Sequence, residues 1–135
     1  MSIFNSVTSR VSVPTSDPFD QSYVVSPGGA TDAVVGVYNA TNRGSGTLLG
    51  DGQWVLTAAH VIFNEPAANM QIAIDLPTGR VYLDVDETFV HEGYDGSSGF
   101  NPANDIALIR LAERAPIAGY DIYRGNAEIG SAFTL

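Results

Sequence analysis

The sequence contains no cysteine, no lysine and no long apolar run. No disulfide can therefore brace the fold, although the absence of cysteine does not by itself assign a compartment. No apolar stretch approaches the ~20 residues that a membrane-spanning helix needs, so no membrane partner is expected. The first 20 residues also lack a basic stretch followed by an apolar one, and no ordinary signal peptide is visible there.

Positive charge is scarce. Six arginines stand against fifteen acidic residues, which gives a formal net charge of −9. Such a surface repels nucleic acid and anionic lipid, and neither is expected as a partner. The same charge favours solubility.

The composition is that of a globular all-β domain. The chain has 135 residues, of which 44% are hydrophobic, so it can bury one core. Fourteen glycines and seven prolines separate short runs of β-forming residues, and little helical periodicity is sustained. The sequence divides into an N-terminal extension with little regular structure, a barrel domain and a crossover segment, at residues 1–22, 23–114 and 115–135.

Alternating and apolar runs predict the strands, which are expected at residues 33–39, 47–49, 54–57, 70–76, 81–90 and 106–111. One helical turn is expected over residues 61–64. Six short strands in this order would close into a single six-stranded Greek-key antiparallel barrel. The last strand is nearly all apolar, so it is expected to be buried on both faces.

A hairpin within Gly44–Ile62 organises the chain. Trp54–Thr57 forms its return strand after a turn at Leu49–Gly52, and His60 follows directly. The apolar return strand anchors the hairpin in the core. The sequence therefore predicts that the backbone holds this one histidine in a rigid position.

Two motifs resemble those of the chymotrypsin-like (trypsin-like) serine proteases. Residues 54–60, Trp-Val-Leu-Thr-Ala-Ala-His, resemble the histidine motif, and residues 104–111, Asn-Asp-Ile-Ala-Leu-Ile-Arg-Leu, resemble the aspartate motif. Residues 89–94 are similar to the segment that precedes the aspartate loop. The resemblance implies the N-terminal barrel half of the two-barrel fold, with His60 as general base and acid and Asp105 as its orienting carboxylate.

The nucleophile of this family lies in a Gly-Asp-Ser-Gly-Gly motif about 90 residues beyond the aspartate. The sequence has no such motif and ends 30 residues after Asp105. Ser131 lacks the flanking glycines and is not expected to replace it. We therefore expect a serine endopeptidase half that acts on protein or peptide substrates and is inactive alone. A second half-domain or chain would carry the serine.

Other interpretations remain open. His60 and Asp105 would also be present in a non-catalytic, protease-like module that binds a partner protein, and they could simply pair within a core. His91 is expected to cap or pack at a strand end. Many relatives brace the histidine loop with a disulfide at the positions of Ser45 and Val61, so packing alone is expected to hold this loop here. The resemblance favours an extracellular location.

No cofactor or metal is expected, although calcium is an alternative. Calcium prefers oxygen-rich loops, and several acidic side chains lie close together in the sequence between residues 84 and 95. Their alternation along the strand favours a solvated strand face over a calcium site. The residues concerned are Asp84, Asp86, Glu87, Glu92 and Asp95.

Overall fold

The computed structural model describes residues 25–96, 103–126 and 129. The N-terminal extension expected at residues 1–22 lies outside these residues. So does Ser131, which is not expected to act as the nucleophile. The described ranges contain the short helix α2 (Ala59–Ile62) and the 3₁₀ helix η2 (Ala67–Asn69). The strands are β1 (Val34–Tyr38), β2 (Arg43–Leu49), β3 (Trp54–Thr57), β4 (Gln71–Leu76), β5 (Gly79–Val90) and β6 (Ala107–Leu111).

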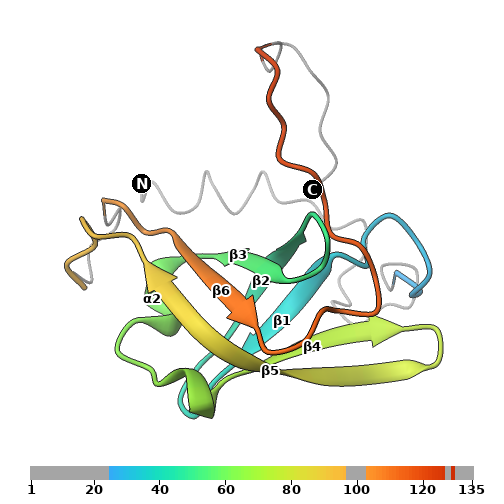
Figure 1. Ribbon diagram of the computed structural model, residues 1–135, viewed down its shortest axis with the longest axis horizontal. Helices are drawn as coiled ribbons and strands as arrows, with labels where there is room; N and C mark the ends of the chain where they lie inside the picture. Colours follow the sequence, from blue (N-terminus) through green and yellow to red (C-terminus); the bar gives the residue numbers. More distant parts are fainter. Residues whose placement is uncertain (1–24, 97–102, 127–128, 130–135) are drawn as a thin grey trace, which may run out of the picture.

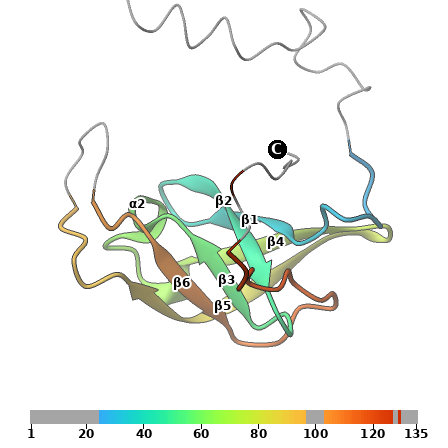
Figure 2. The same ribbon diagram turned by 90° about the horizontal axis from the view of Figure 1, so that it is seen from above.

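The strands close into one barrel in the order β1-β2-β3-β6-β5-β4, and each neighbouring pair is antiparallel (Figures 1 and 2). β3 pairs with β6, the last strand in the sequence, while β4 pairs back onto β1. These non-sequential pairings confirm the predicted all-β fold, a six-stranded antiparallel barrel.

Alternate side chains of every strand fill the barrel interior, as a closed sheet requires. Each such side chain contributes about 1.5–3 kcal/mol when it is taken fully out of water. The largest fully buried side chains come from these strands, from α2 (Ile62) and from the residue before β4 (Met70); the others are Val37, Leu48, Val55, Ile72, Ile74, Ile109 and Leu111.

The expectation that the last strand is buried on both faces is wrong. In β6, Ala107, Ile109 and Leu111 are buried, whereas Leu108 and Arg110 are only partly buried. A closed barrel has a single interior, so the alternate residues must face outward. The apolar Leu108 therefore lies on the outer surface.

The glycine-rich entry to the hairpin is part of a strand, because β2 begins at Arg43 and not at residue 47. A Cβ atom at Gly46 would lie 2.6 Å from Cγ1 of Val55, and one at Gly44 would lie 2.7 Å from Cγ1 of Val61. Glycine thus lets β2 approach β3 and α2 closely. The helical turn also begins earlier than expected, at Ala59, and includes His60.

The segment after β6 returns along β2 before it leaves the barrel (Figure 1). Tyr120 forms a parallel bridge with Leu49, its amide donates to the Leu48 carbonyl at 2.8 Å, and its carbonyl accepts from Gly50 at 3.0 Å. The division between barrel and crossover at residue 115 stays a prediction. Among the described residues no helix is both long and apolar enough to cross a membrane.

Candidate active site

Strand pairing brings His60 and Asp105 together. Thr57 at the end of β3 lies opposite Ala107 at the start of β6. His60 follows Thr57 by three residues and Asp105 precedes Ala107 by two, so both lie at the same end of the barrel. In Figures 1 and 2, α2 and the chain entering β6 are found at that end.

One carboxylate binds both the backbone and the side chain of the histidine. The His60 amide donates to Oδ1 of Asp105 at 2.8 Å, and Nδ1 of the His60 ring lies 2.7 Å from Oδ2. The His60 side chain is 62% exposed and that of Asp105 is 20% exposed. The pair thus consists of a sheltered carboxylate and an imidazole that is open to solvent.

The hydrogen bonds change the ionisation of Asp105. The bond from the His60 side chain, followed by the bond from the His60 amide, lowers the pKa of Asp105 below its usual value. The carboxylate is therefore charged at neutral pH and can only accept, so the proton on the neutral His60 ring is assigned to Nδ1. Nε2 is then the ring nitrogen with a free lone pair, as a general base requires.

An aromatic pair packs beside the dyad. Tyr94 is buried, and its ring meets that of Phe63 edge to face at 5.1 Å. Burial, followed by the charges of Asp105 and Asp95, raises the pKa of Tyr94, so its hydroxyl stays neutral. The sequence placed Tyr94 within a family-like segment but gave no signal of this packing.

Asn104 shapes the backbone that leads into Asp105. It adopts a left-handed conformation with φ of 61°, which asparagine tolerates better than most residues. Its Nδ2 donates to the Gly93 carbonyl at 3.0 Å. The amide of the same glycine, Gly93, donates to Nδ1 of His91 at 3.0 Å. His91 therefore caps the turn after β5, as predicted.

The histidine loop is held by more than packing, which corrects the expectation from the sequence. Nδ2 of Asn39 donates to the Val61 carbonyl at 2.8 Å, and Oγ1 of Thr57 donates to the Ser45 carbonyl at 2.9 Å. Sequence reasoning missed Asn39, because its partner lies 22 residues further along the chain.

The acidic residues considered for calcium are partly engaged by other side chains. Arg110 binds Asp86 at 2.8 Å and Glu87 at 2.7 Å, and Gln71 donates to Asp84 at 3.3 Å. Within the described ranges, no group of three His, Cys, Asp or Glu side chains is arranged to hold a metal ion. The expectation of no metal, with calcium as its alternative, stays a prediction.

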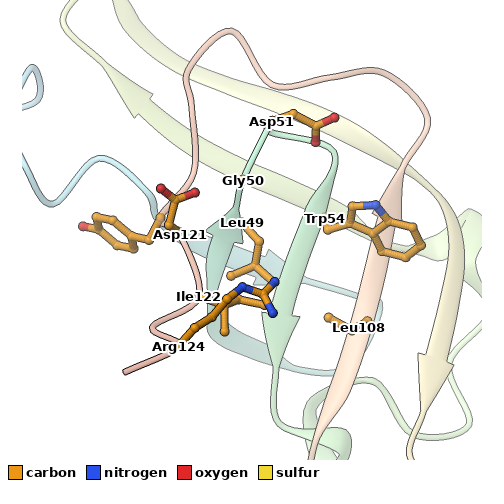
Figure 3. A pocket seen from close by; sticks show the side chains of 9 residues that line it. Leu49, Gly50, Asp51, Trp54, Leu108, Asp121, Ile122 and Arg124 are labelled. Atoms are coloured by element: carbon orange, nitrogen blue, oxygen red, sulfur yellow. The ribbon is translucent and has the colours of Figure 1, made fainter. Parts of the chain in front are cut away.

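A separate pocket of about 330 Å³ lies on the outer surface of the barrel, and neither His60 nor Asp105 lines it (Figure 3). In Figure 3, Trp54 and Leu108 form one side, while Leu49, Ile122 and Arg124 lie on the other. The complete lining comprises Leu49, Gly50, Asp51, Trp54, Leu108, Tyr120, Asp121, Ile122 and Arg124.

Comparisons with known proteins agree with this arrangement. The sequence model of the trypsin family matches residues 23–124. The chain is 35% identical over 86 residues to the complement C1r subcomponent-like protein of Rattus norvegicus, covering 56% of this chain and 18% of that protein. It is 37% identical over 78 residues to chymotrypsin-C of Bos taurus, covering 54% and 28% respectively.

Solved structures show the same fold. The VesB protease of Vibrio cholerae matches with a TM-score of 0.54 and 26% identity over 65% of this chain and 29% of that one. Mouse neuropsin, a serine protease expressed in the limbic system of the brain, matches with a TM-score of 0.53 and 23% identity, over 66% and 40%.

A closed six-stranded barrel that carries these motifs defines one half of a trypsin-like fold. The chain belongs to the trypsin family. It spans less than a third of the length of the curated relatives that it matches.

Proposed function

We propose that this chain supplies the general base, His60, and the orienting acid, Asp105, of a serine endopeptidase. The observation that carries the proposal is the double contact of Asp105, which binds the His60 amide and Nδ1 together. This contact fixes both the tautomer and the orientation of the ring. Membership of the trypsin family adds the reaction class, which is hydrolysis of peptide bonds in protein substrates.

In this proposal Nε2 of His60 takes the proton of a serine hydroxyl as the oxygen attacks the scissile carbonyl. The ring is then positively charged, and the Asp105 carboxylate stabilises it. His60 next returns the proton to the leaving amine. These roles are those of the family's triad, and the geometry at His60 and Asp105 is compatible with them.

The serine would come from a second half-domain or a second chain. The 135 residues contain no Gly-Asp-Ser-Gly-Gly motif, and the part that this chain matches is 40% of one structural relative and 29% of the other. The chain alone would then be inactive. As the family resemblance implies, we place the activity outside the cell.

An exposed apolar surface supports a missing second half. Trp54, Leu108 and Phe89 come from three adjacent strands and face outward, with the Trp54 and Phe89 rings 5.7 Å apart. Phe89 is 41% exposed and nearby Ile106 is 46% exposed. Apolar surface of this kind is typical of an interface. Ile106 directly follows Asp105 in the sequence, so a second half that covered Ile106 would lie next to the dyad.

The experiment is intact-mass analysis of the protein purified from its native source, followed by a peptidase assay of the purified species. A co-purifying polypeptide or continuation with a Gly-Asp-Ser-Gly-Gly motif, together with activity that His60→Ala abolishes, supports the proposal. If residues 1–135 purified alone cleave peptides and lose this activity on His60→Ala, the half-site proposal fails.

The exposed surface also favours a second candidate, a non-catalytic module that binds a partner protein through Trp54 and Leu108. A single species of 14.3 kDa that shows no hydrolysis, yet retains a partner protein in a way that depends on Trp54, would support the module.

A further inference from the structure

The position of the His60 ring depends on α2, a helix of a single turn. Such a short helix has almost no stability of its own in water, and its N-cap residue, Ala58, makes no side-chain hydrogen bond to it. The contacts between α2 and the rest of the chain therefore decide where the imidazole lies relative to Asp105.

One of these contacts comes from outside the dyad, from the Asn39 side chain just after β1. Its Nδ2 donates to the Val61 carbonyl at 2.8 Å in a partly buried contact. Val61 lies at the C-terminal end of α2, where carbonyl oxygens lack a donor within the helix. Asn39 supplies this hydrogen bond.

The same side chain also fixes the turn between β1 and β2. Its Oδ1 accepts from the backbone amides of Thr41 at 3.0 Å and Asn42 at 2.6 Å. The hydroxyl of Thr41 in turn donates to Oε1 of Glu65 at 2.6 Å, just beyond α2. Two side chains of one turn thus bind the chain at the end of α2 and directly after it.

We propose that Asn39 is a positioning residue for the dyad. Its amide fastens the β1–β2 turn to α2 and so holds His60 against Asp105, in a chain that has no cysteine to form a covalent link at Val61. The catalytic importance of this contact rests on the proposed function. The effect of this contact on the geometry of the dyad does not depend on the proposed function.

The test compares two isosteric variants of the 135-residue chain. Asn39→Asp keeps the acceptor for the turn but replaces the Nδ2 donor with an oxygen that faces the Val61 carbonyl. Asn42→Asp adds the same charge in the same turn, at an exposed side chain. The readouts are the pKa of Asp105, from carbon NMR of its carboxyl group, and hydrogen exchange of the His60 amide.

We expect Asn39→Asp to raise the pKa of Asp105 towards its ordinary value and to accelerate exchange of the His60 amide about tenfold, the equivalent of one hydrogen bond. Asn42→Asp should change neither quantity. If both variants match the wild type, or if both change alike, the inference is overturned. Should Asn39→Asp not fold, Thr41→Val removes the hydroxyl contacts to Glu65 and to Oδ1 of Asn39 while keeping the Asn39 donor, and the same two readouts must then shift in the same direction or the inference fails.

These readouts need no peptidase activity, so they separate this inference from the proposed function. In an assembled active protease, Asn39→Asp should lower kcat with little change in KM. An active protease in which this variant keeps its full kcat would overturn the inference while leaving the proposed function intact.

Discussion

Asp105 accepts two hydrogen bonds from the same residue, one from the His60 amide at 2.8 Å and one from Nδ1 of the ring at 2.7 Å. A carboxylate that binds a ring nitrogen alone leaves the backbone free to move. Here the second bond fixes the backbone of α2 as well, so ring and helix are held by one side chain. The consequences of this contact can be measured.

Substitution of Asp105 by Asn should abolish most of the activity in an assembled protease. Asparagine can donate to Nδ1, which favours the wrong tautomer and leaves the imidazolium without its counter-charge. The expected loss in kcat is about 10⁴-fold, the figure established for a triad of this family. Circular dichroism of the variant should match the wild type, and a loss of less than tenfold would contradict the assigned role.

The same contact should make stability depend on pH in the acid range. The pKa of Asp105 is lowered in the folded chain, so its stabilising contribution is complete above the unfolded value of about 3.9 and is lost as the pH falls through the lower folded value. Urea unfolding of wild type and Asp105→Asn at pH 6 and pH 2 measures this. The difference between the two proteins should shrink at pH 2, and a constant difference would show that the carboxylate charge contributes nothing.

Two neighbouring residues of β6 should differ sharply in their effect on stability. Ile109 is fully buried in the barrel, so Ile109→Ala should cost about 2–5 kcal/mol. Leu108 faces outward and is only partly buried, so Leu108→Ala should cost about 1 kcal/mol or less in the isolated chain. Denaturant unfolding of both variants checks this, and equal costs would contradict the inward and outward assignment.

Calcium should neither bind nor stabilise this chain. Arg110 already forms ion pairs with Asp86 and Glu87, so a cation that bound both would have to displace a guanidinium. Isothermal calorimetry should give no heat of binding at millimolar calcium, and the thermal midpoint should stay the same with and without chelator. A saturable heat would restore the calcium alternative.

The fold was predictable because its signals are local. Alternation in residues 81–90 and the turn glycines before Trp54 are visible in the sequence, and the six strands follow from such patterns. Where prediction failed, the cause was tertiary. Gly44 and Gly46 look like turn residues, yet they lie in β2, where Val61 and Val55 leave no room for a Cβ atom.

The candidate site was predictable through motifs and only in part. His60 and Asp105 stand in recognisable segments, and the pairing of β3 with β6 explains how two residues 45 positions apart in the sequence come into contact. Asn39 has no motif, since a hydrogen bond to a backbone carbonyl places no demand on the residue type of its partner. The outward direction of Leu108 was likewise hidden, because apolarity alone does not reveal which face of a strand is covered.

The central claim is that this chain contributes the base and its orienting acid to a serine endopeptidase whose nucleophile lies elsewhere. The most direct measurement is labelling of the natively purified protein with a fluorophosphonate, which reacts with an activated serine, in wild type and His60→Ala. The account predicts a labelled serine outside residues 1–135 and loss of that label in the variant. Labelling within residues 1–135, or labelling that His60→Ala leaves unchanged, would contradict it.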